Sequence, residues 1–231
     1  MFNGIIYDVA PGNVNTMFHC INTETKNTFV VMCGITTMPK DGEEIESNEI
    51  TAQDVMKLED VASIPYQIDF DIPIVKVVCG DLFAGMLTAE GQVFTWGYNN
   101  YGQLGLKQER TLYVQRPNRI EFIDHHSDSA GRPASIKDIS FGYNHGLALT
   151  DDNKVFVWGR RMGIYPNIEL TYNYLNANKH LQQIEINQSE PRLVGNNLIF
   201  YKITKLCAGP WNSALITDKN QVLIQGENEF G

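Results

Sequence analysis

The stretch IVKVVCG at residues 74–80 recurs twice further along the chain. It returns as IKDISFG at residues 136–142 and as ITKLCAG at residues 203–209. Each copy has an apolar residue six and three positions before its glycine, and a threonine and a second glycine follow at fixed distances. These later positions are Thr88, Thr150 and Thr217, then Gly97, Gly159 and Gly226. Three gap-free copies over this distance indicate a structural repeat.

A fourth, degenerate copy opens the chain. Ile6 and Val9 precede Gly12, and VVMC at residues 30–33 precedes Gly34. The first glycines of the four copies, at 12, 80, 142 and 209, are 68, 62 and 67 residues apart. Periods of this length are typical of a multi-stranded unit and exclude a coiled coil. We expect repeats at about residues 4–68, 72–120, 136–194 and 201–231, the last of them cut inside the repeat.

Each repeat predicts about four antiparallel strands. Two short apolar segments, 84–88 and 93–96, flank a turn in which Gly91, Asn153 and Asn220 align. Glycine and asparagine both tolerate the positive φ that tight hairpins need. A further strand is expected at 65–68, 117–120 and 191–194, where a leading proline suits a sheet edge. Four such strands form a propeller blade, so the predicted fold class is all-β.

Aligned residues also predict how the blades pack. Small residues coincide at Ala84, Gly146 and Ser213, and we expect neighbouring blades to press together there. Trp96 and Trp158 align and should fill the space between blades. Cys33 in the first copy and Gln225 in the fourth replace this tryptophan. Those two blades should therefore pack less tightly or in a different way.

The segment WGYNNYGQLG at residues 96–105 closely resembles the signature WGxNxxGQLG of the regulator-of-chromosome-condensation family. The segment GYNH at residues 142–145 is similar to the family's GxxH start of the second strand. The resemblance implies an RCC1-like propeller of seven blades, of which this chain supplies about four. The loops after Gly34 and Gly159 depart from the signature. Four blades cannot close such a ring, so we expect C-terminal blades of a longer protein, another chain or a homo-oligomer to complete it.

Two insertions, at residues 35–64 and 160–190, are predicted to carry partner contacts, because loops on rigid blades carry specificity. The first holds an acidic loop and a capping-box pattern from Thr51 to Asp54 that predicts a short helix. Alternatively, both insertions only pack over the propeller rim, and Trp211 is a packed loop residue rather than a contact. The candidate partner-binding residues, which are aromatic or acidic, are Trp211, Tyr98, Tyr143, Tyr172, Tyr174, Glu43 and Glu44.

Composition limits the classes of partner. The chain has 18 basic and 27 acidic residues, a net charge of -9, which disfavours nucleic acid. No signal-peptide pattern opens the sequence and no apolar run is long enough to insert in a membrane. We expect an intracellular protein, cytoplasmic or cytoskeletal, with a ciliary location compatible. The cysteines, which form no CxxC pair, are predicted to be reduced core residues: Cys20, Cys33, Cys79 and Cys207.

Candidate catalytic groups are weak. His125 and His126 lie beside aspartates in a polar loop with no spaced partner, so we predict no metal site. His145 aligns with Phe83 and Asn212, which favours a structural role. No phosphate-binding GxxxxGK[ST] loop is present, and no catalytic residue or cofactor is predicted.

The sequence therefore predicts a noncatalytic protein–protein interaction scaffold, a subunit or domain of a larger assembly, and not an enzyme. From the resemblance comes the alternative of a guanine-nucleotide exchange factor for a small GTPase. Inhibitor-like binding to an enzyme is a third reading.

Overall fold

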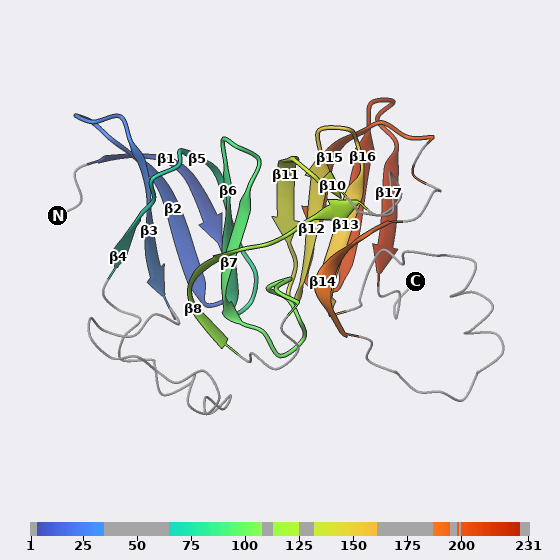
Figure 1. The fold of residues 1–231 in the computed structure, drawn as a ribbon, viewed down its shortest axis with the longest axis horizontal. Helices are drawn as coiled ribbons and strands as arrows, with labels where there is room; N and C mark the ends of the chain where they lie inside the picture. Colours follow the sequence, from blue (N-terminus) through green and yellow to red (C-terminus); the bar gives the residue numbers. More distant parts are fainter. Residues whose placement is uncertain are drawn as a thin grey trace.

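The computed structural model describes residues 4–34, 65–107, 113–124, 132–160, 187–194, 198 and 200–226. These residues form antiparallel sheets, each with its strands in sequence order (Figure 1). Three sheets have four strands, which confirms the predicted all-β class and the four-stranded blades. No helix in the described ranges combines the length and hydropathy that a membrane span requires. Residues 35–64 and 161–186, nearly all of the two predicted insertions, lie outside the description.

The strands are grouped into four blades and one small pair. Blade 1 consists of β1 (Gly4–Pro11), β2 (Asn15–Asn22), β3 (Thr28–Gly34) and β4 (Tyr66–Asp69). Blade 2 consists of β5 (Ile74–Cys79), β6 (Phe83–Thr88), β7 (Val93–Tyr98) and β8 (Tyr113–Arg119). Blade 3 consists of β11 (Ile136–Phe141), β12 (His145–Thr150), β13 (Val155–Arg160) and β14 (Asn187–Leu193). Blade 4 has β15 (Ile203–Ala208), β16 (Asn212–Thr217) and β17 (Val222–Gly226), and β9 (Ile123–Asp124) pairs with β10 (Arg132–Pro133).

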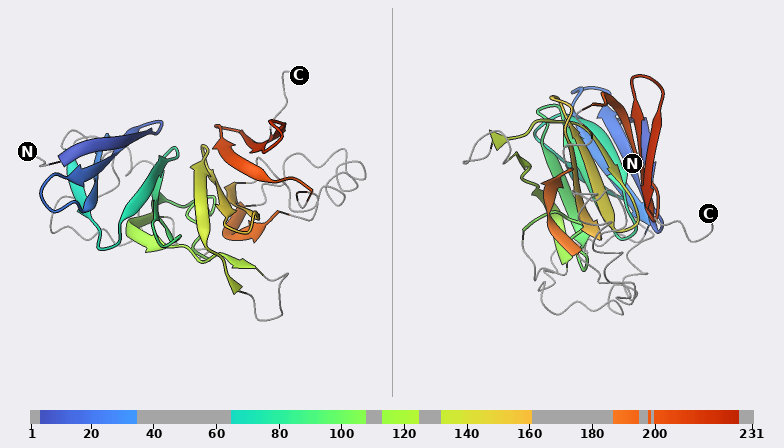
Figure 2. Two further views of the ribbon diagram at one scale, coloured as in Figure 1. Left: turned by 90° about the horizontal axis from the view of Figure 1, so that it is seen from above. Right: turned by 90° about the vertical axis from the view of Figure 1, so that its right-hand side faces the viewer.

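The blades stand side by side in a curved row, with β1 at one end and β17 at the other (Figure 2, left). The first strands of neighbouring blades, β1, β5, β11 and β15, contact one another in succession. The hairpin turns between second and third strands lie along the upper edge of Figure 1. The loops between first and second strands therefore lie at the opposite end of the blades.

The repeated threonine caps each of these hairpin turns. The side-chain oxygens of Thr88, Thr150 and Thr217 accept a hydrogen bond from the backbone N–H four residues later, at 3.2, 2.8 and 3.1 Å. The turn position between them has φ of 72° at Gly91, 69° at Asn153 and 58° at Asn220. The prediction of positive φ at these positions is thus confirmed.

Steric contacts explain why the repeat has a glycine near the end of the third strand. Gly97 and Gly159 adopt φ of 108° and 92°. A Cβ at Gly97 would lie 2.5 Å from the carbonyl oxygen of Leu82, and one at Gly159 would lie 2.4 Å from that of Asn144. The loop between the first and second strands presses on this backbone, so only glycine fits.

The fourth strands differ from their prediction in two blades. β8 and β14 begin before Pro117 and Pro191, so these prolines lie inside the strands. Each lies where the pairing register shifts, for example where Thr95 pairs with Asn118 but Gly97 pairs with Val114. A residue in such an irregularity does not donate to the ladder, which is why proline is tolerated there.

Apolar side chains between blades form three core clusters. Trp96 is fully buried among residues of blades 1 and 2, and Trp158 is buried between blades 2 and 3. The third cluster, between blades 3 and 4, is aliphatic at its centre. The prediction that both tryptophans fill space between blades is therefore confirmed. The four cysteines are free thiols, but Cys207 is exposed, against the prediction of a core residue.

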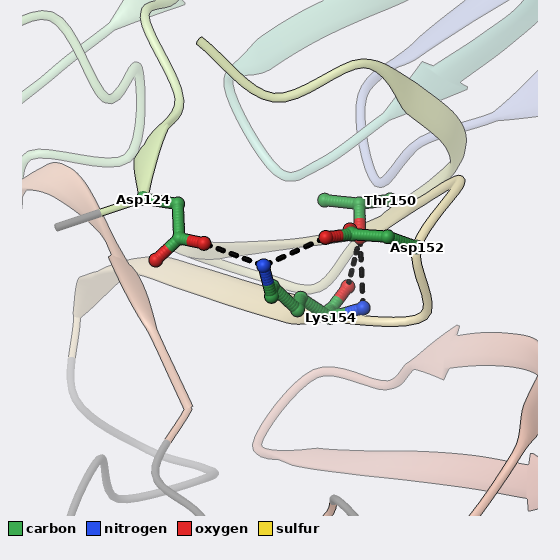
Figure 3. A network of polar contacts seen from close by, with 4 residues as sticks. All are labelled: Asp124, Thr150, Asp152 and Lys154. Carbon is green, nitrogen blue, oxygen red and sulfur yellow. Dashed lines mark hydrogen bonds and ion pairs between the residues drawn. The ribbon is translucent and has the colours of Figure 1, made fainter. Parts of the chain in front are cut away.

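An ion-pair network joins the segment after blade 2 to blade 3 (Figure 3). The Lys154 ammonium lies 2.5 Å from an Asp124 oxygen and 2.7 Å from an Asp152 oxygen. Asp124 belongs to β9 and its side chain is 5% exposed, whereas Lys154 follows the hairpin turn of blade 3. Hydrogen bonds to Asp124 and Asp152 raise the pKa of Lys154. The network fixes the position of β9 against this hairpin.

Candidate partner-binding surface

The four loops between first and second strands are each closed by the same type of backbone hydrogen bond. The N–H of each repeat glycine donates to the carbonyl three residues later, at 2.8 Å from Gly12 and Gly80 and at 2.9 Å from Gly142 and Gly209. This closure places the two intervening residues of every loop at the end of its blade. The repeat therefore presents equivalent positions side by side.

Neighbouring loops are also hydrogen-bonded to one another. The Asp81 N–H donates to the Tyr143 carbonyl at 3.1 Å, and the Tyr143 N–H donates to the Pro210 carbonyl at 3.3 Å. The Asn13 side-chain amide donates to an Asp81 carboxylate oxygen at 2.8 Å. The loops of all four blades thus form one connected surface at this end of the row.

Four side chains at this end form what we call the aromatic–arginine cluster: Tyr101, Tyr143, Arg160 and Trp211. The Tyr143 and Trp211 rings lie 4.8 Å apart between centroids, tilted by 32°. The Arg160 guanidinium carbon lies 5.0 Å from the Tyr101 ring centroid and 5.6 Å from that of Trp211. All four residues are half-buried. The cation–π contacts hold a charged group among aromatic faces that still reach solvent.

Tyr143 is tied to blade 2 by its hydroxyl as well as by its backbone. Burial, the negative charge of Asp81 and a hydrogen bond to that carboxylate all raise the pKa of Tyr143. The phenol is therefore neutral at physiological pH and donates to Asp81. This bond orients the ring that Trp211 packs against.

Buried residues of the signature segment at residues 96–105 join neighbouring blades. Asn99 accepts the Leu104 N–H at 3.0 Å through its side chain, which shapes the loop. Gln103 is fully buried, and its carbonyl accepts the Trp158 indole N–H at 2.8 Å. The segment thus connects blade 2 to the central tryptophan of blade 3.

The structure brings together two of the predicted partner-binding residues. Tyr143 and Trp211 belong to the cluster, whereas Tyr98 is 9% exposed and packs with Tyr113 and Leu82. The structure does not describe the remaining four: Tyr172, Tyr174, Glu43 and Glu44. The contact role of all seven stays a prediction.

Sequence reasoning missed Tyr101 and Arg160. Tyr101 stands at a variable position of the signature, and Arg160 directly follows Gly159, where the signature is lost. The sequence signal that could have identified Arg160 was its position directly after the repeat glycine Gly159.

His145 lies in an interface between blades, which fits the predicted structural role. It is 2% exposed, and its Nε2 lies 2.9 Å from the Ser213 hydroxyl. Burial lowers the pKa of His145 to about 4, so the imidazole is neutral at physiological pH. Within the described ranges, no group of three or more His, Cys, Asp or Glu side chains could hold a metal ion.

A separate cavity of about 320 Å³ lies near β9 and β14. Its lining residues are Lys107, Glu121, Ile123, Glu190, Pro191, Arg192 and Leu193. Lys107 pairs with Glu121 at 3.1 Å, and Arg192 lies 4.0 Å from Glu190. Because its charges are paired, this cavity is a weaker candidate for a partner than the loop end.

Comparison with known proteins agrees with this architecture. The family model of the regulator of chromosome condensation (RCC1) repeat matches residues 90–149, and a second model of the same description matches residues 74–103. A bifunctional serine/threonine-protein kinase/NEDD4-like E3 ubiquitin-protein ligase of Dictyostelium discoideum is 29% identical over 160 residues, which cover 69% of this chain and 8% of that protein. The chain spans less than a fifth of the length of the first curated relatives that it matches.

Solved structures are similar in fold. Human WBSCR16 superposes with a TM-score of 0.67 at 17% identity, covering 99% of this chain and 50% of WBSCR16. Prp20p of Saccharomyces cerevisiae gives a TM-score of 0.66 at 19% identity, covering 98% of this chain and 46% of Prp20p. The chain thus spans about half of each of these structures.

Proposed function

We propose that this chain, which is an RCC1-like repeat protein with an incomplete β-propeller fold, is a noncatalytic protein-interaction scaffold of a larger assembly, and that the aromatic–arginine cluster contacts its protein partner. The observation that carries this proposal is the position of Arg160 beside the rings of Tyr101 and Trp211. Tryptophan, tyrosine and arginine are the residue types that dominate binding energy at protein interfaces.

The rigidity of the cluster supports a binding role. The backbone N–H groups of Tyr101, Tyr143 and Arg160 are all hydrogen-bonded, and Tyr143 is also held by Asp81. A preorganised surface loses little conformational entropy when a partner binds. We place this interaction inside the cell, in the cytoplasm or at the cytoskeleton.

Relatives also support a protein partner. The Prp20p structure is described with its binding properties to Gsp1p and histones. By analogy, a small GTPase is the partner class of the alternative function, guanine-nucleotide exchange. The negative net charge of the present chain continues to disfavour nucleic acid.

The test is a comparison of matched variants. Partners crosslinked to the full chain in its own cells are identified, and the affinity of the purified pair is then measured for Trp211→Ala and Arg160→Ala. We expect binding to weaken about 10- to 30-fold for either change, the range typical of interface anchors. Phe200→Ala is the control, because Phe200 is 83% exposed and lies outside the cluster. Equal affinity in all three variants would remove the cluster from the interface.

Nucleotide release separates the two functions. If the partner is a small GTPase, its loss of labelled GDP is followed with and without the chain. A stoichiometric complex with an unchanged release rate supports a scaffold. Accelerated release at substoichiometric amounts of the chain would replace the scaffold with exchange activity.

A further inference from the structure

The aromatic–arginine cluster contains one charged side chain among its four members. Only Arg160 is charged, because tryptophan and tyrosine rings are neutral at physiological pH. Burial and the negative charge of Asp81 raise the pKa of Tyr143, which keeps its phenol protonated. Since all four members are half-buried, a partner meets both the cation and the rings.

The carboxylate that adjoins the cluster, Asp81, binds groups of the chain itself. It is 9% exposed. One of its oxygens accepts the Asn13 side-chain amide at 2.8 Å, and the carboxylate also accepts the Tyr143 hydroxyl. A buried carboxylate with two donors presents little negative charge to a partner. The charge that a partner meets is therefore that of Arg160, opposite in sign to the net charge of -9 of the whole chain.

Arg160 can bind a carboxylate in addition to the contacts that it makes within the chain. A guanidinium has five N–H donors, and two of them match the two oxygens of a carboxylate. The guanidinium carbon lies 5.0 Å from the Tyr101 ring centroid and 5.6 Å from that of Trp211. These contacts are attractions between the charge and the ring faces. They hold the cation in place, so little side-chain entropy is lost when a carboxylate binds.

The rings beside Arg160 offer an apolar contact area. Tyr143 and Trp211 lie 4.8 Å apart between centroids and are tilted by 32°, so each ring supports the other. Half-buried rings lose further water when an apolar side chain packs on them. A group that matches the cluster therefore combines a carboxylate with a neighbouring apolar side chain. A basic side chain would instead meet the like charge of Arg160.

We propose that the cluster recognises an acidic peptide segment of its protein partner. In this segment an aspartate or glutamate pairs with Arg160, and an adjacent apolar side chain packs on Trp211 and Tyr143. The inference rests on the proposed function, because it names the chemistry of the partner at the same surface. Charge complementarity at Arg160, together with the apolar rings, selects this class of segment.

Salt dependence is a direct consequence of this assignment. The negative chain repels an acidic segment at long range, whereas Arg160 attracts it at contact. Salt screens exposed charges beyond the Debye length of about 8 Å at physiological ionic strength and screens a partly buried pair much less. The association rate should therefore rise with salt, while the dissociation rate changes less. A basic segment would show the opposite trend, with slower association at higher salt.

A displayed library of short random peptides is the probe. Peptides that bind the whole immobilised chain are sequenced, and we expect enrichment of aspartate or glutamate next to an aromatic or aliphatic residue. Arg160→Met should remove the acidic preference and keep the apolar one, and Arg160→Glu should replace it with a preference for basic residues. Arg192→Glu is the control for charge reversal, because Arg192 is 62% exposed and lies outside the cluster. Circular dichroism checks that each variant is folded.

A selected acidic peptide and a counterpart with its carboxylate replaced by an amide measure the ion pair. Arg160→Met should weaken binding of the acidic peptide about 10-fold, as expected for a hydrogen bond to a charged group. Binding of the amide counterpart should change little. Equal losses for the two peptides would mean that Arg160 acts by packing alone, which overturns the proposal.

The outcome of the selection is decisive in either direction. Peptides without an acidic preference, peptides rich in basic residues, or no bound peptide at all would overturn the acidic segment. The scaffold proposal fails separately, when neither Trp211→Ala nor Arg160→Ala weakens binding of the crosslinked partner. If both changes weaken that binding but Arg160→Glu leaves the charge preference of the peptides unchanged, the surface is confirmed and the acidic segment is wrong.

Discussion

The interface between blades 2 and 3 is filled by aromatic rings, whereas the interface between blades 3 and 4 combines aliphatic residues with polar pairs. In the first, Phe83 stacks on Phe141 with centroids 4.8 Å apart, and Phe122 meets Trp158 edge-on at 5.5 Å. In the second, His145 pairs with Ser213, and the buried cluster consists of leucine, isoleucine and valine side chains. Phe83 and His145 occupy the same repeat position.

This difference separates the contribution of the backbone from that of the side chains. Both interfaces keep the hydrogen bond from the isoleucine N–H to the preceding hairpin turn. The side chains then decide the character of each interface. One interface depends on packed volume, and the other contains a group whose charge changes with pH.

The largest expected effect is the loss of Trp158. Trp158→Ala removes a side chain that is 2% exposed, and we expect the free energy of unfolding to fall by about 3–5 kcal/mol. Urea denaturation measures the change. A loss below about 1 kcal/mol would mean that the neighbouring rings collapse into the space.

Comparing substitutions at Trp158 and Trp96 separates the contribution of the indole hydrogen bond from that of packing. Trp158 Nε1 donates to the Gln103 carbonyl, whereas Trp96 Nε1 is buried and has no hydrogen-bond partner among the described residues. Trp158→Phe should therefore cost about 1 kcal/mol more than Trp96→Phe.

The interface between blades 3 and 4 should weaken in acid. His145 has a pKa of about 4 when folded against 6.5 when unfolded, so the unfolded chain takes up the proton first as the pH falls. The stabilising contribution is complete above pH 6.5 and declines as the pH falls toward 4. Between pH 7 and pH 5 we expect a loss of about 2 kcal/mol from this group.

His145→Gln tests this assignment, because glutamine can still bond to Ser213 but does not titrate. Urea titrations at several pH values should show a shallower acid dependence in this variant. Burial also lowers the pKa of His19, so some dependence should remain, and His19→Gln measures that part. An unchanged slope in His145→Gln would show that this imidazole is protonated equally in both states.

A smaller effect is expected at the polar edge of the same interface. Asn153 donates to the Tyr201 carbonyl and accepts the Ile203 N–H, both at 2.8 Å. Asn153→Gly keeps the positive φ but removes both bonds, and we expect a loss of about 1–2 kcal/mol by urea denaturation. Asn220→Gly is the control and should be nearly neutral, because Asn220 is exposed. Equal losses of stability in Asn153→Gly and Asn220→Gly would mean that the change comes from the turn conformation and not from the two hydrogen bonds.

Much of the fold could be predicted because the repeat encodes backbone requirements. Thr88, Gly91 and Gly97 have equivalents at the same spacing in the other repeats. Thr88 caps the hairpin turn, and the two glycines adopt positive φ, so these roles depend only on nearby residues. The start of β8, before Pro117, could not be predicted, because its irregular pairing depends on the neighbouring strand.

The candidate surface was only half predictable. Trp211 and Tyr143 stand out as loop aromatics, but their contact, and the place of Arg160 and Tyr101 beside them, depend on how blades meet across long sequence distances. Exposure of Cys207 was missed for the same reason: its equivalents Val78 and Ser140 face a following blade, and the described residues contain none after blade 4.

The smallest effect is expected from the ion pairs at the edge of the aromatic interface. Lys154→Gln introduces the residue that the neighbouring copies carry at Gln92 and Gln221. Because Lys154 is 33% exposed, the loss should be about 1 kcal/mol or less and should shrink further in high salt. Asp152→Asn is the matched control, since it removes the exposed partner and leaves the buried Asp124 paired with Lys154. The contradicting outcome is a loss of unfolding free energy in Lys154→Gln that does not depend on salt and exceeds the loss in Asn153→Gly. It would mean that the buried Asp124 carboxylate, rather than the aromatic rings, determines how β9 holds blades 2 and 3 together.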